Sequence, residues 1–240
     1  KLAGSSEETV VLGAHLDSIN AIDGSEGDAP GADDEGSGIA ILTEILHIIE
    51  QKGLRFHKTV ELQAYAAEEV GLVGSRAIAS SYRQAGRSIA GMMQFDMAYY
   101  SQTSDLGKIF FLEDYTSPDL FRNSITLLKR YLKSPYERGV LPRGSASDHK
   151  SYWEQGYPTI FPFENPKADN PYIHTANDTM DKFDDGLRMK RMVQLGLLFL
   201  SYQAGLVSLD DQAGAEKERL KQADLSKDLF LHLSGKGGSY

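Results

Sequence analysis

The residues best suited to metal chemistry are histidines and carboxylates that follow short apolar segments. The segment VVLGAHLDS places His15 and Asp17 directly after an apolar run that begins at Val10. Imidazole is the commonest side-chain ligand of transition metals, and a carboxylate two residues away can hold the other ring nitrogen and fix its tautomer. A Gly-rich loop then leads to the acidic run Asp33–Glu35. These residue types predict a metal site, although a solvated acidic loop beside a surface histidine has the same pattern.

Two adjacent acidic residues, Glu68 and Glu69, follow the apolar segment that ends at Ala66. Adjacent carboxylates repel each other, and burying both is costly unless a cation compensates. Because adjacent side chains point apart, one carboxylate can bind a metal while the other takes a proton from an attacking water. An acidic start to the next helix, which the helix dipole favours, explains the same pair without any chemistry.

Further metal-capable groups occur at the ends of other predicted strands. Asp96 follows an apolar segment, and His174 lies in the loop Asn170–Thr175. In open α/β sheets, ligands bind outside the carboxyl ends of the strands. A single acidic residue after a strand is typically a turn or capping residue. Here such groups follow three strands, which instead indicates one shared site. They are His15, the adjacent Glu68 and Glu69, and Asp96.

These groups require a framework of alternating strands and helices to bring them together. Apolar runs bounded by turn residues predict strands, and apolar residues at helical spacing predict helices. The alternation predicts a single α/β domain with a mostly parallel mixed β-sheet, flanked by helices on both faces. The predicted strands are Thr9–Ala14, Thr59–Ala66, Ser88–Phe95, Lys108–Leu112 and Thr159–Phe163, and the predicted helices are Ile39–Gln51, Leu72–Gln84, Ser117–Lys133, Ser147–Gln155 and Asp184–Leu206. In the last helix, the residues expected to face the core are Leu187, Met192, Leu195, Leu198 and Phe199.

Composition narrows the classes of partner. The 240 residues include 25 basic and 34 acidic side chains, which gives a net charge of −9. This charge argues against nucleic acid as a partner, since that requires a basic surface. An apolar run of about 18 residues, the minimum for a transmembrane helix, does not occur, so we expect no membrane span. Because the chain has no cysteine, a zinc site must use His, Asp and Glu.

Taken together, the motifs resemble those of the co-catalytic two-zinc aminopeptidases of the bacterial leucyl aminopeptidase type. The similar stretches run in family order over roughly residues 1–206: GAHLDS (13–18), APGADDEGSG (29–38), AYAAEEVGLVGS (64–75), QFDM (94–97), SDH (147–149), PFE (162–164) and NPYIHTAND (170–178). The resemblance implies a zinc exopeptidase-like fold, two Zn²⁺ ions and hydrolysis of the N-terminal bond of peptide substrates with a free N-terminus. It also implies a secreted or periplasmic location.

The resemblance implies a role for each candidate residue. Asp34 resembles the carboxylate that bridges both zinc ions. His15 and Asp96 resemble the terminal ligands of one ion, and Glu69 and His174 resemble those of the other. Glu68 resembles the general base, and Asp17 resembles the carboxylate that supports His15.

The resemblance extends to the substrate pocket. Met97, Phe161 and Phe163 match positions that line an apolar pocket for the first residue in similar enzymes. This implies a preference for leucine-like or aromatic first residues, although apolar residues beside strands are also typical of a core. The segment around the bridging residue further predicts a cis peptide bond between Asp34 and Glu35.

One loop departs from the family pattern. Relatives often carry a disulfide and a tyrosine before the SDH motif, whereas Leu141–Ala146 contains neither. Either Arg143 replaces this tyrosine in stabilising the oxyanion, or no residue does. His149 of the SDH motif is expected to lie near the site without binding metal.

The sequence divides into a predicted catalytic domain, residues 1–207, and a charged appendage, residues 208–240. Relatives have N-terminal helices and a strand before the position of Lys1, so we expect the given chain to be incomplete as a folding unit. Either a cleaved N-terminal fragment of the same chain stays bound, or another element such as Ser208–Tyr240 covers that side of the sheet.

Three alternatives to an aminopeptidase are consistent with the residues. A related metallo-carboxypeptidase would need a cation for the C-terminus of its substrate, for which Arg143 is the candidate. A glutaminyl cyclase would bind one zinc, whereas Asp34, Glu69 and His174 together favour two ions. A non-catalytic binding domain on the same fold would be expected to have lost ligands, and none is lost here.

Overall fold

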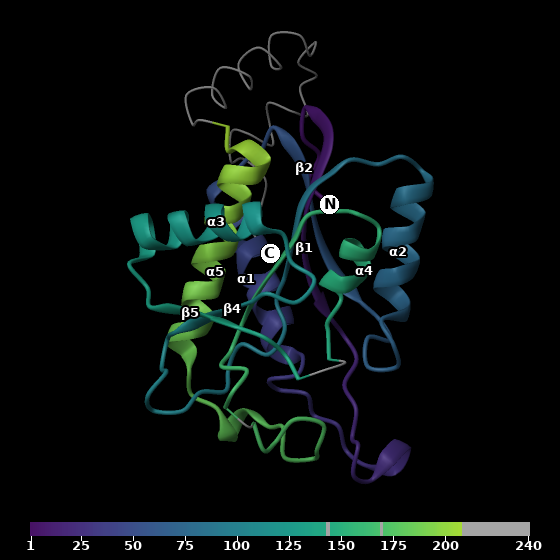
Figure 1. Ribbon diagram of the computed structural model, residues 1–240, viewed down its shortest axis with the longest axis vertical. Coiled ribbons are helices and arrows are strands. Elements are labelled where there is room, and N and C mark those ends of the chain that lie inside the picture. Colours follow the sequence, from purple (N-terminus) through teal and green to yellow (C-terminus); the bar gives the residue numbers. More distant parts are fainter. Residues whose placement is uncertain (143–144, 169, 208–240) are drawn as a thin grey trace, which may run out of the picture.

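The computed structural model describes residues 1–142, 145–168 and 170–207. These residues form one six-stranded sheet with the strand order β2-β1-β3-β6-β4-β5 (Figure 1). All neighbouring strands pair in parallel except β4 and β6, which are antiparallel. The predicted mostly parallel mixed sheet is thereby confirmed. The strands are β1 (Ser6–His15), β2 (Lys58–Tyr65), β3 (Ile89–Gln94), β4 (Ile109–Leu112), β5 (Tyr136–Gly139) and β6 (Thr159–Phe163).

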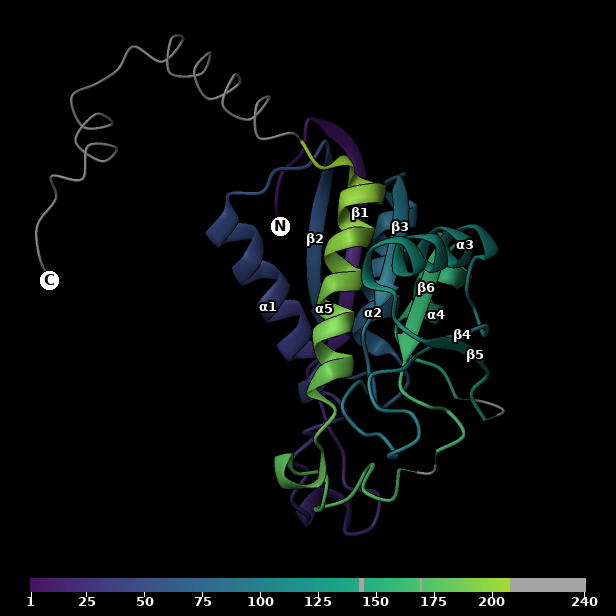
Figure 2. The same ribbon diagram turned by 90° about the vertical axis from the view of Figure 1, so that its left-hand side faces the viewer.

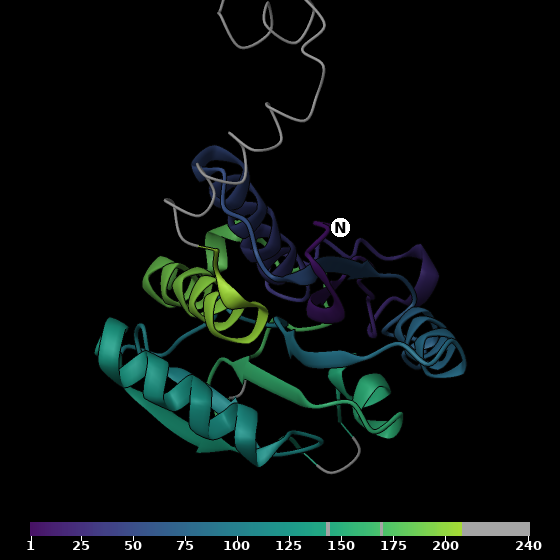
Figure 3. The same cartoon turned by 90° about the horizontal axis from the view of Figure 1, so that it is seen from above.

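Helices cover both faces of this sheet, as the sequence predicts. Figures 2 and 3 show α1, α3 and α5 on one side and α2 and α4 on the other. The helices are α1 (Gly36–Lys52), α2 (Val73–Gln84), α3 (Pro118–Leu127), α4 (His149–Glu154) and α5 (Gly186–Leu200). Short 3₁₀ helices occur at Gly24–Glu26 and Met180–Lys182, and π-helical turns extend α3 and α5 at Leu128–Leu132 and Ser201–Gly205. Within the described ranges, no helix has both the length and the apolar character needed to cross a bilayer.

The apolar run in β1 explains why both faces are covered. Val10 and Leu12 belong to the core beneath α1 and α5, whereas Val11 packs with Tyr65 and Tyr152 on the opposite face. Successive side chains in a strand point to opposite faces. A strand segment that is buried on both faces therefore needs an apolar residue at every position, and the run Val10–Leu12 within β1 supplies it.

The structure corrects the sequence analysis at two places. Strand β5 was not predicted, because Tyr136–Gly139 carries exposed charges and lies at the sheet edge, where a strand needs little apolar content. Leu187 was predicted to face the core but is 49% exposed. The fully buried residue in that turn is Arg188, whose guanidinium pairs with Asp185 at 3.1 Å and with Asp105 at 3.3 Å.

Helix α1 begins directly after the acidic run and packs closely on the end of β3. A Cβ atom at Gly38 would lie 2.6 Å from the carbonyl oxygen of Phe95 and 1.7 Å from Oε1 of Glu35, so only glycine fits there. The peptide bond between Asp34 and Glu35 is cis, and this prediction is confirmed. The close approach places the acidic run beside the carboxyl ends of the strands.

A polar network joins the outer strand β2 to helix α2. Arg87 donates a hydrogen bond to Glu61 at 2.8 Å, and Tyr82 and Gln63 also donate to this carboxylate. Burial favours the neutral carboxyl, but these hydrogen bonds outweigh it and lower the pKa of Glu61 to about 2. Glu61 therefore stabilises the fold when it is ionised.

We expect Glu61→Gln to lower the free energy of unfolding at pH 7 by about 1.5–3 kcal/mol, the range for hydrogen bonds to a charged group. Because the pKa of Glu61 is lowered on folding, its contribution is present above the unfolded-state pKa of about 4.3 and is lost as the pH falls. It vanishes near the folded pKa of about 2. Urea unfolding at a series of pH values measures the difference between the two proteins.

The control is Glu137→Gln, because Glu137 is half-exposed and pairs with Lys108 at the surface. This variant should leave the free energy of unfolding nearly unchanged, because water and salt screen an exposed ion pair. The wild type and Glu61→Gln should differ less in free energy of unfolding as the pH falls. A difference that stays constant from pH 7 to the acid limit would contradict the lowered pKa of Glu61.

Candidate active site

The predicted metal ligands meet at one edge of the sheet. His15 ends β1, and its strand partner Tyr65 ends β2, just before Glu68 and Glu69. Asp96 follows β3 on the other side of β1. Asp34 lies immediately before α1, and His174 comes from the loop between β6 and α5. The aligned strand ends therefore bring together groups that are far apart in the sequence.

The carboxylate of Asp34 faces a different histidine with each of its oxygens. Its Oδ1 lies 3.2 Å from Nε2 of His15, and its Oδ2 lies 2.9 Å from Nε2 of His174. Burial raises the pKa of Asp34, but the hydrogen bonds from the two histidines outweigh burial and lower it. An ionised carboxylate with its two oxygens directed in this way can be shared by two cations.

Two groups of donor atoms lie on either side of Asp34. On one side, Oε2 of Glu69 is 3.1 Å from Nε2 of His174. Donor atoms of Asp34, Glu69 and His174 all lie within 4.8 Å of one another. On the other side, Oδ2 of Asp96 is 3.7 Å from Nε2 of His15. Each group combines imidazole with carboxylate, the donor types that zinc accepts in the absence of cysteine.

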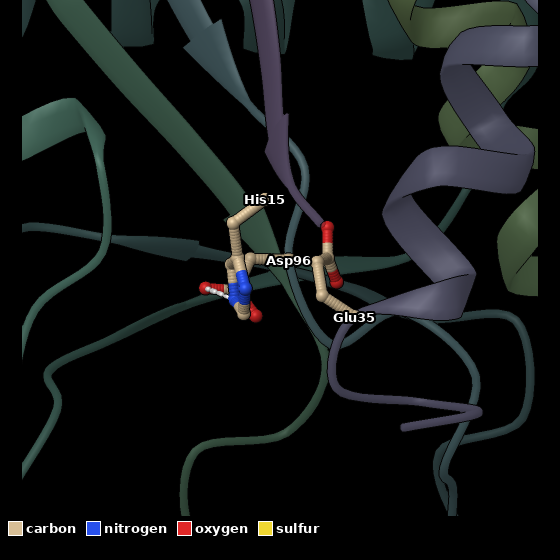
Figure 4. A group of neighbouring side chains, drawn as sticks. All are labelled: His15, Glu35 and Asp96. Carbon is tan, nitrogen blue, oxygen red and sulfur yellow. Dashed lines mark ion pairs between the residues drawn. The ribbon is translucent and has the colours of Figure 1, made fainter. Parts of the chain in front are cut away.

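Glu35 joins the second group, although its sequence context predicted no role for it. Donor atoms of His15, Glu35 and Asp96 also lie within 4.8 Å of one another, and Figure 4 shows Glu35 beside the pair. Its Oε2 accepts a hydrogen bond from the backbone N–H of Met97 at 3.1 Å. The acidic run before α1 indicated that carboxylates lie near the site. It did not show that Glu35, in addition to Asp34, would turn toward His15 and Asp96.

The charges of the cluster fit divalent cations. Burial and the nearby carboxylate of Asp96 raise the pKa of Glu68 to about 9. Hydrogen bonds to Asp34 and Glu69 raise the pKa of His174 to about 10. Oε1 of Glu69 is buried and has no hydrogen-bond partner in the described part of the chain. Positive charge at this position would compensate the crowded carboxylates and give the free oxygen a partner.

Asp17 supports the cluster in a different way from the one expected. Nδ1 of His15 contacts the backbone carbonyl oxygen of Asp17 at 2.9 Å, whereas the carboxylate oxygen is 3.7 Å away. The carbonyl can hold Nδ1 as the donor and leave Nε2 free to bind a metal. The carboxylate of Asp17 instead accepts hydrogen bonds from the backbone N–H groups of Glu68 at 3.0 Å and Glu69 at 3.2 Å.

An apolar wall adjoins the metal-capable groups. Met97, Phe161 and Phe163 line the same pocket as these groups, and its volume is about 580 Å³. The rings of Phe161 and Phe163 meet edge to face with centroids 5.2 Å apart. Phe161 is fully buried, so it belongs to the core as well as to the pocket wall.

Two further residues were predicted to lie near the site, His149 and Arg143. His149 lies behind the wall, with its ring centroid 4.6 Å from that of Phe161 and its Nε2 bonded to the carbonyl oxygen of Asp114. Burial lowers the pKa of His149 to about 4, and the residue belongs to neither donor group. Arg143 lies outside the described residues.

Asp178 connects the two loops that carry Asp34 and His174. Its Oδ1 accepts a hydrogen bond from the N–H of Asp33 at 2.9 Å, and its Oδ2 accepts one from the N–H of Asp34 at 3.1 Å. The N–H of Ala32 also bonds to the carbonyl oxygen of Asp178 at 3.0 Å. Because His174 lies only four residues earlier, these bonds fix the position of Asp34 relative to His174.

Comparison with known proteins identifies relatives of the chain. Residues 1–196 match peptidase family M28. Leucine aminopeptidase 1 of Fusarium vanettenii is 37% identical over 223 residues, which covers 88% of this chain and 56% of that protein. The chain spans about half the length of the curated relatives that it matches.

Solved structures of Legionella pneumophila proteins have the same fold. LapB is 33% identical with a TM-score of 0.75, and the match covers 82% of this chain and 52% of LapB. The LapA aminopeptidase is 32% identical with a TM-score of 0.74, and the match covers 83% of this chain and 53% of LapA.

We expect Asp178→Asn to weaken zinc binding about 10- to 100-fold, the usual effect of losing a residue that supports metal ligands. The amide places an NH₂ group against one of the two backbone N–H groups that the carboxylate now accepts. Calorimetric titration with Zn²⁺ measures the affinity. Asp181→Asn, an exposed change three residues later, should bind zinc like the wild type. Equal affinities for both variants would contradict a supporting role for Asp178.

We expect Asp34→Ala to lose both metal ions rather than one, because the two donor groups meet at this carboxylate. Elemental analysis after dialysis against a limiting zinc concentration gives the number of ions per chain. Asp28→Ala, in the exposed part of the preceding loop, serves as the control. One ion retained at full occupancy in Asp34→Ala would show that Asp34 does not bridge.

Proposed function

Because the chain belongs to peptidase family M28, we propose that it is a zinc-dependent aminopeptidase that hydrolyses the N-terminal peptide bond of peptides. The single observation that carries this proposal is the position of Asp34 between His15 and His174, with one oxygen toward each. A free α-amino group is a suitable substrate feature for such a site, because the nitrogen of a neutral amine is a donor type that zinc accepts.

We assign one ion to His15, Asp96 and Asp34, and a second ion to Asp34, Glu69 and His174. When bound, two zinc ions supply the Lewis acidity that lowers the pKa of a water and polarises a carbonyl group. Imidazole nitrogens and carboxylate oxygens without sulfur suit this metal. The chain's own residues hold the ions and carry the proton.

Glu68 is proposed as the general base. Its backbone N–H is held by Asp17, and its side chain lines the same pocket as both donor groups. The carboxylate accepts a proton from the attacking water and then delivers it to the leaving amine. Burial raises the pKa of Glu68 most, and repulsion by Asp96 adds to it; positive charge beside Asp96 would offset this repulsion and favour the ionised carboxylate that a base requires.

The apolar wall supports a preference for leucine-like or aromatic first residues. Met97, Phe161 and Phe163 present carbon and sulfur atoms to the pocket that contains Glu68. Discrimination between similar apolar side chains is limited, because one methylene group contributes only about 1–3 kcal/mol. A charged or very small first residue should be a poor substrate.

Two finer proposals rest on the resemblance to leucyl aminopeptidases. We propose a secreted or periplasmic location, which fractionation of the producing cells tests. We also propose that residues 1–207 form the catalytic unit.

The proposed activity predicts a specific profile. The zinc-loaded protein should hydrolyse leucine-p-nitroanilide and peptides with leucine or phenylalanine first, and it should lose this activity with a chelator and regain it with Zn²⁺. N-acetylated peptides should resist hydrolysis. Release of the C-terminal residue from N-acetylated peptides would instead identify a carboxypeptidase, and binding without turnover would identify a binding domain.

We expect Glu68→Gln to lower kcat by about 10²- to 10⁴-fold, the usual contribution of a general base, while zinc content is unchanged. The amide keeps the shape of the side chain but cannot accept the proton. The measurement is kcat for leucine-p-nitroanilide, together with zinc analysis of the same sample. Near-normal turnover at full zinc content would remove Glu68 from the mechanism.

A further inference from the structure

Two basic side chains, Arg76 and Lys150, line the pocket of the candidate active site. They are the only Lys or Arg residues among the described residues that line it, whereas its acidic lining residues are Asp34, Glu68, Glu69, Asp96 and Glu164. The metal ligands and the general base account for none of this positive charge. The two cations therefore require a separate explanation.

The fold brings Arg76 and Lys150 to one junction, between α2 and α4. Oγ of Ser75 and Oγ of Ser151 form a buried hydrogen bond of 2.8 Å between these helices. Arg76 follows Ser75 in the chain, and Lys150 precedes Ser151. The two basic residues thus flank the point where the helices are joined, and both line the same pocket.

The same junction is connected to the general base. The N–H of Leu72 bonds to the carbonyl oxygen of Glu68 at 2.8 Å, and the N–H of Arg76 bonds to that of Leu72 at 3.0 Å. Arg76 therefore lies two hydrogen-bonded turns after Glu68. The apolar wall comes from other elements, since Phe161 and Phe163 belong to β6.

Neither basic group is held by a strong partner in the described part of the chain. Arg76 is exposed and makes no ion pair there. Nζ of Lys150 lies 3.9 Å from Oε1 of Glu154, too far for a hydrogen bond, and 4.7 Å from the ring centroid of Tyr115. The charge of Arg76 is therefore available to a ligand, and Lys150 would exchange two weak contacts, the exposed pair with Glu154 and the ring of Tyr115, for one.

We propose that Arg76 and Lys150 bind a carboxylate group on the C-terminal side of the scissile bond. The carboxylate is the C-terminus of a short peptide or an acidic side chain close to the N-terminus. A guanidinium group matches a carboxylate with two parallel hydrogen bonds, and the ammonium group of Lys150 adds a second positive charge. The inference rests on the proposed aminopeptidase function and names its substrate class.

The test compares peptides that differ only in this carboxylate. Leu-Gly, Leu-Gly-Gly and Leu-Gly-Gly-Gly are each assayed as the free acid and as the amide, and Leu-Glu-Gly amide is compared with Leu-Gln-Gly amide. The first series detects a terminal carboxylate and its distance from the scissile bond, and the second detects an acidic side chain. We expect kcat/KM to favour the carboxylate form in at least one pair.

We expect Arg76→Gln or Lys150→Met to lower that preference by about 2- to 5-fold, and the double variant to lower it by about 5- to 20-fold, as for partly exposed ion pairs. Salt at about 0.5 M should reduce the preference in the wild type, because it screens exposed charges. Arg83→Gln is the matched control: it removes the same charge from an exposed position of α2 that does not line the pocket. It should leave the preference unchanged.

An equal preference in the wild type and the double variant overturns the carboxylate site. If the zinc-loaded protein hydrolyses none of these peptides, the aminopeptidase proposal fails, and calorimetric binding of the Leu-Gly-Gly acid and amide decides the carboxylate site separately. Tighter binding of the acid by the wild type, lost in the double variant, supports the site. Equal binding of acid and amide rejects it.

Discussion

The structure depends on burying several carboxylates side by side at one edge of the sheet. The supporting carboxylates are held by backbone N–H groups: Asp17 by Glu68 and Glu69, Asp178 by Asp33 and Asp34, and Glu35 by Met97. The carboxylates of Asp34, Glu69 and Asp96 instead face imidazole nitrogens. Backbone N–H groups thus hold one set of carboxylates in place, and the other set faces the two histidines of the candidate metal site.

The hydrogen bonds to the supporting carboxylates also join the loops to one another. The residues that accept backbone N–H groups come from a different loop than the residues they hold, so each carboxylate joins two chain segments. Two participating residues, Met97 and His174, have positive φ angles of 52° and 57°. Such angles are uncommon outside glycine and occur often at functional sites, where surrounding contacts fix them.

The features predicted best from the sequence are those that depend on the local pattern of apolar residues. The apolar run of β1 predicted a strand buried on both faces, and its end predicted the position of His15. The neighbouring strands β2 and β3 were predicted equally well, which placed Glu68, Glu69 and Asp96. The same reasoning missed β5, whose charged edge position gives no apolar signal. It also missed Arg188, because the partners that make its burial possible are distant in sequence.

The burial of Arg188 has a consequence for the segment between β3 and β4. Its guanidinium group also donates hydrogen bonds to the carbonyl oxygens of Lys108 at 2.7 Å and Asp105 at 3.2 Å. Opening this segment would leave a buried charge without partners, which is strongly unfavourable. Loops usually open before the core does, but the hydrogen-bonded amides of Asp105, Gly107 and Lys108 should exchange with solvent only in the same cooperative unfolding that exposes the sheet.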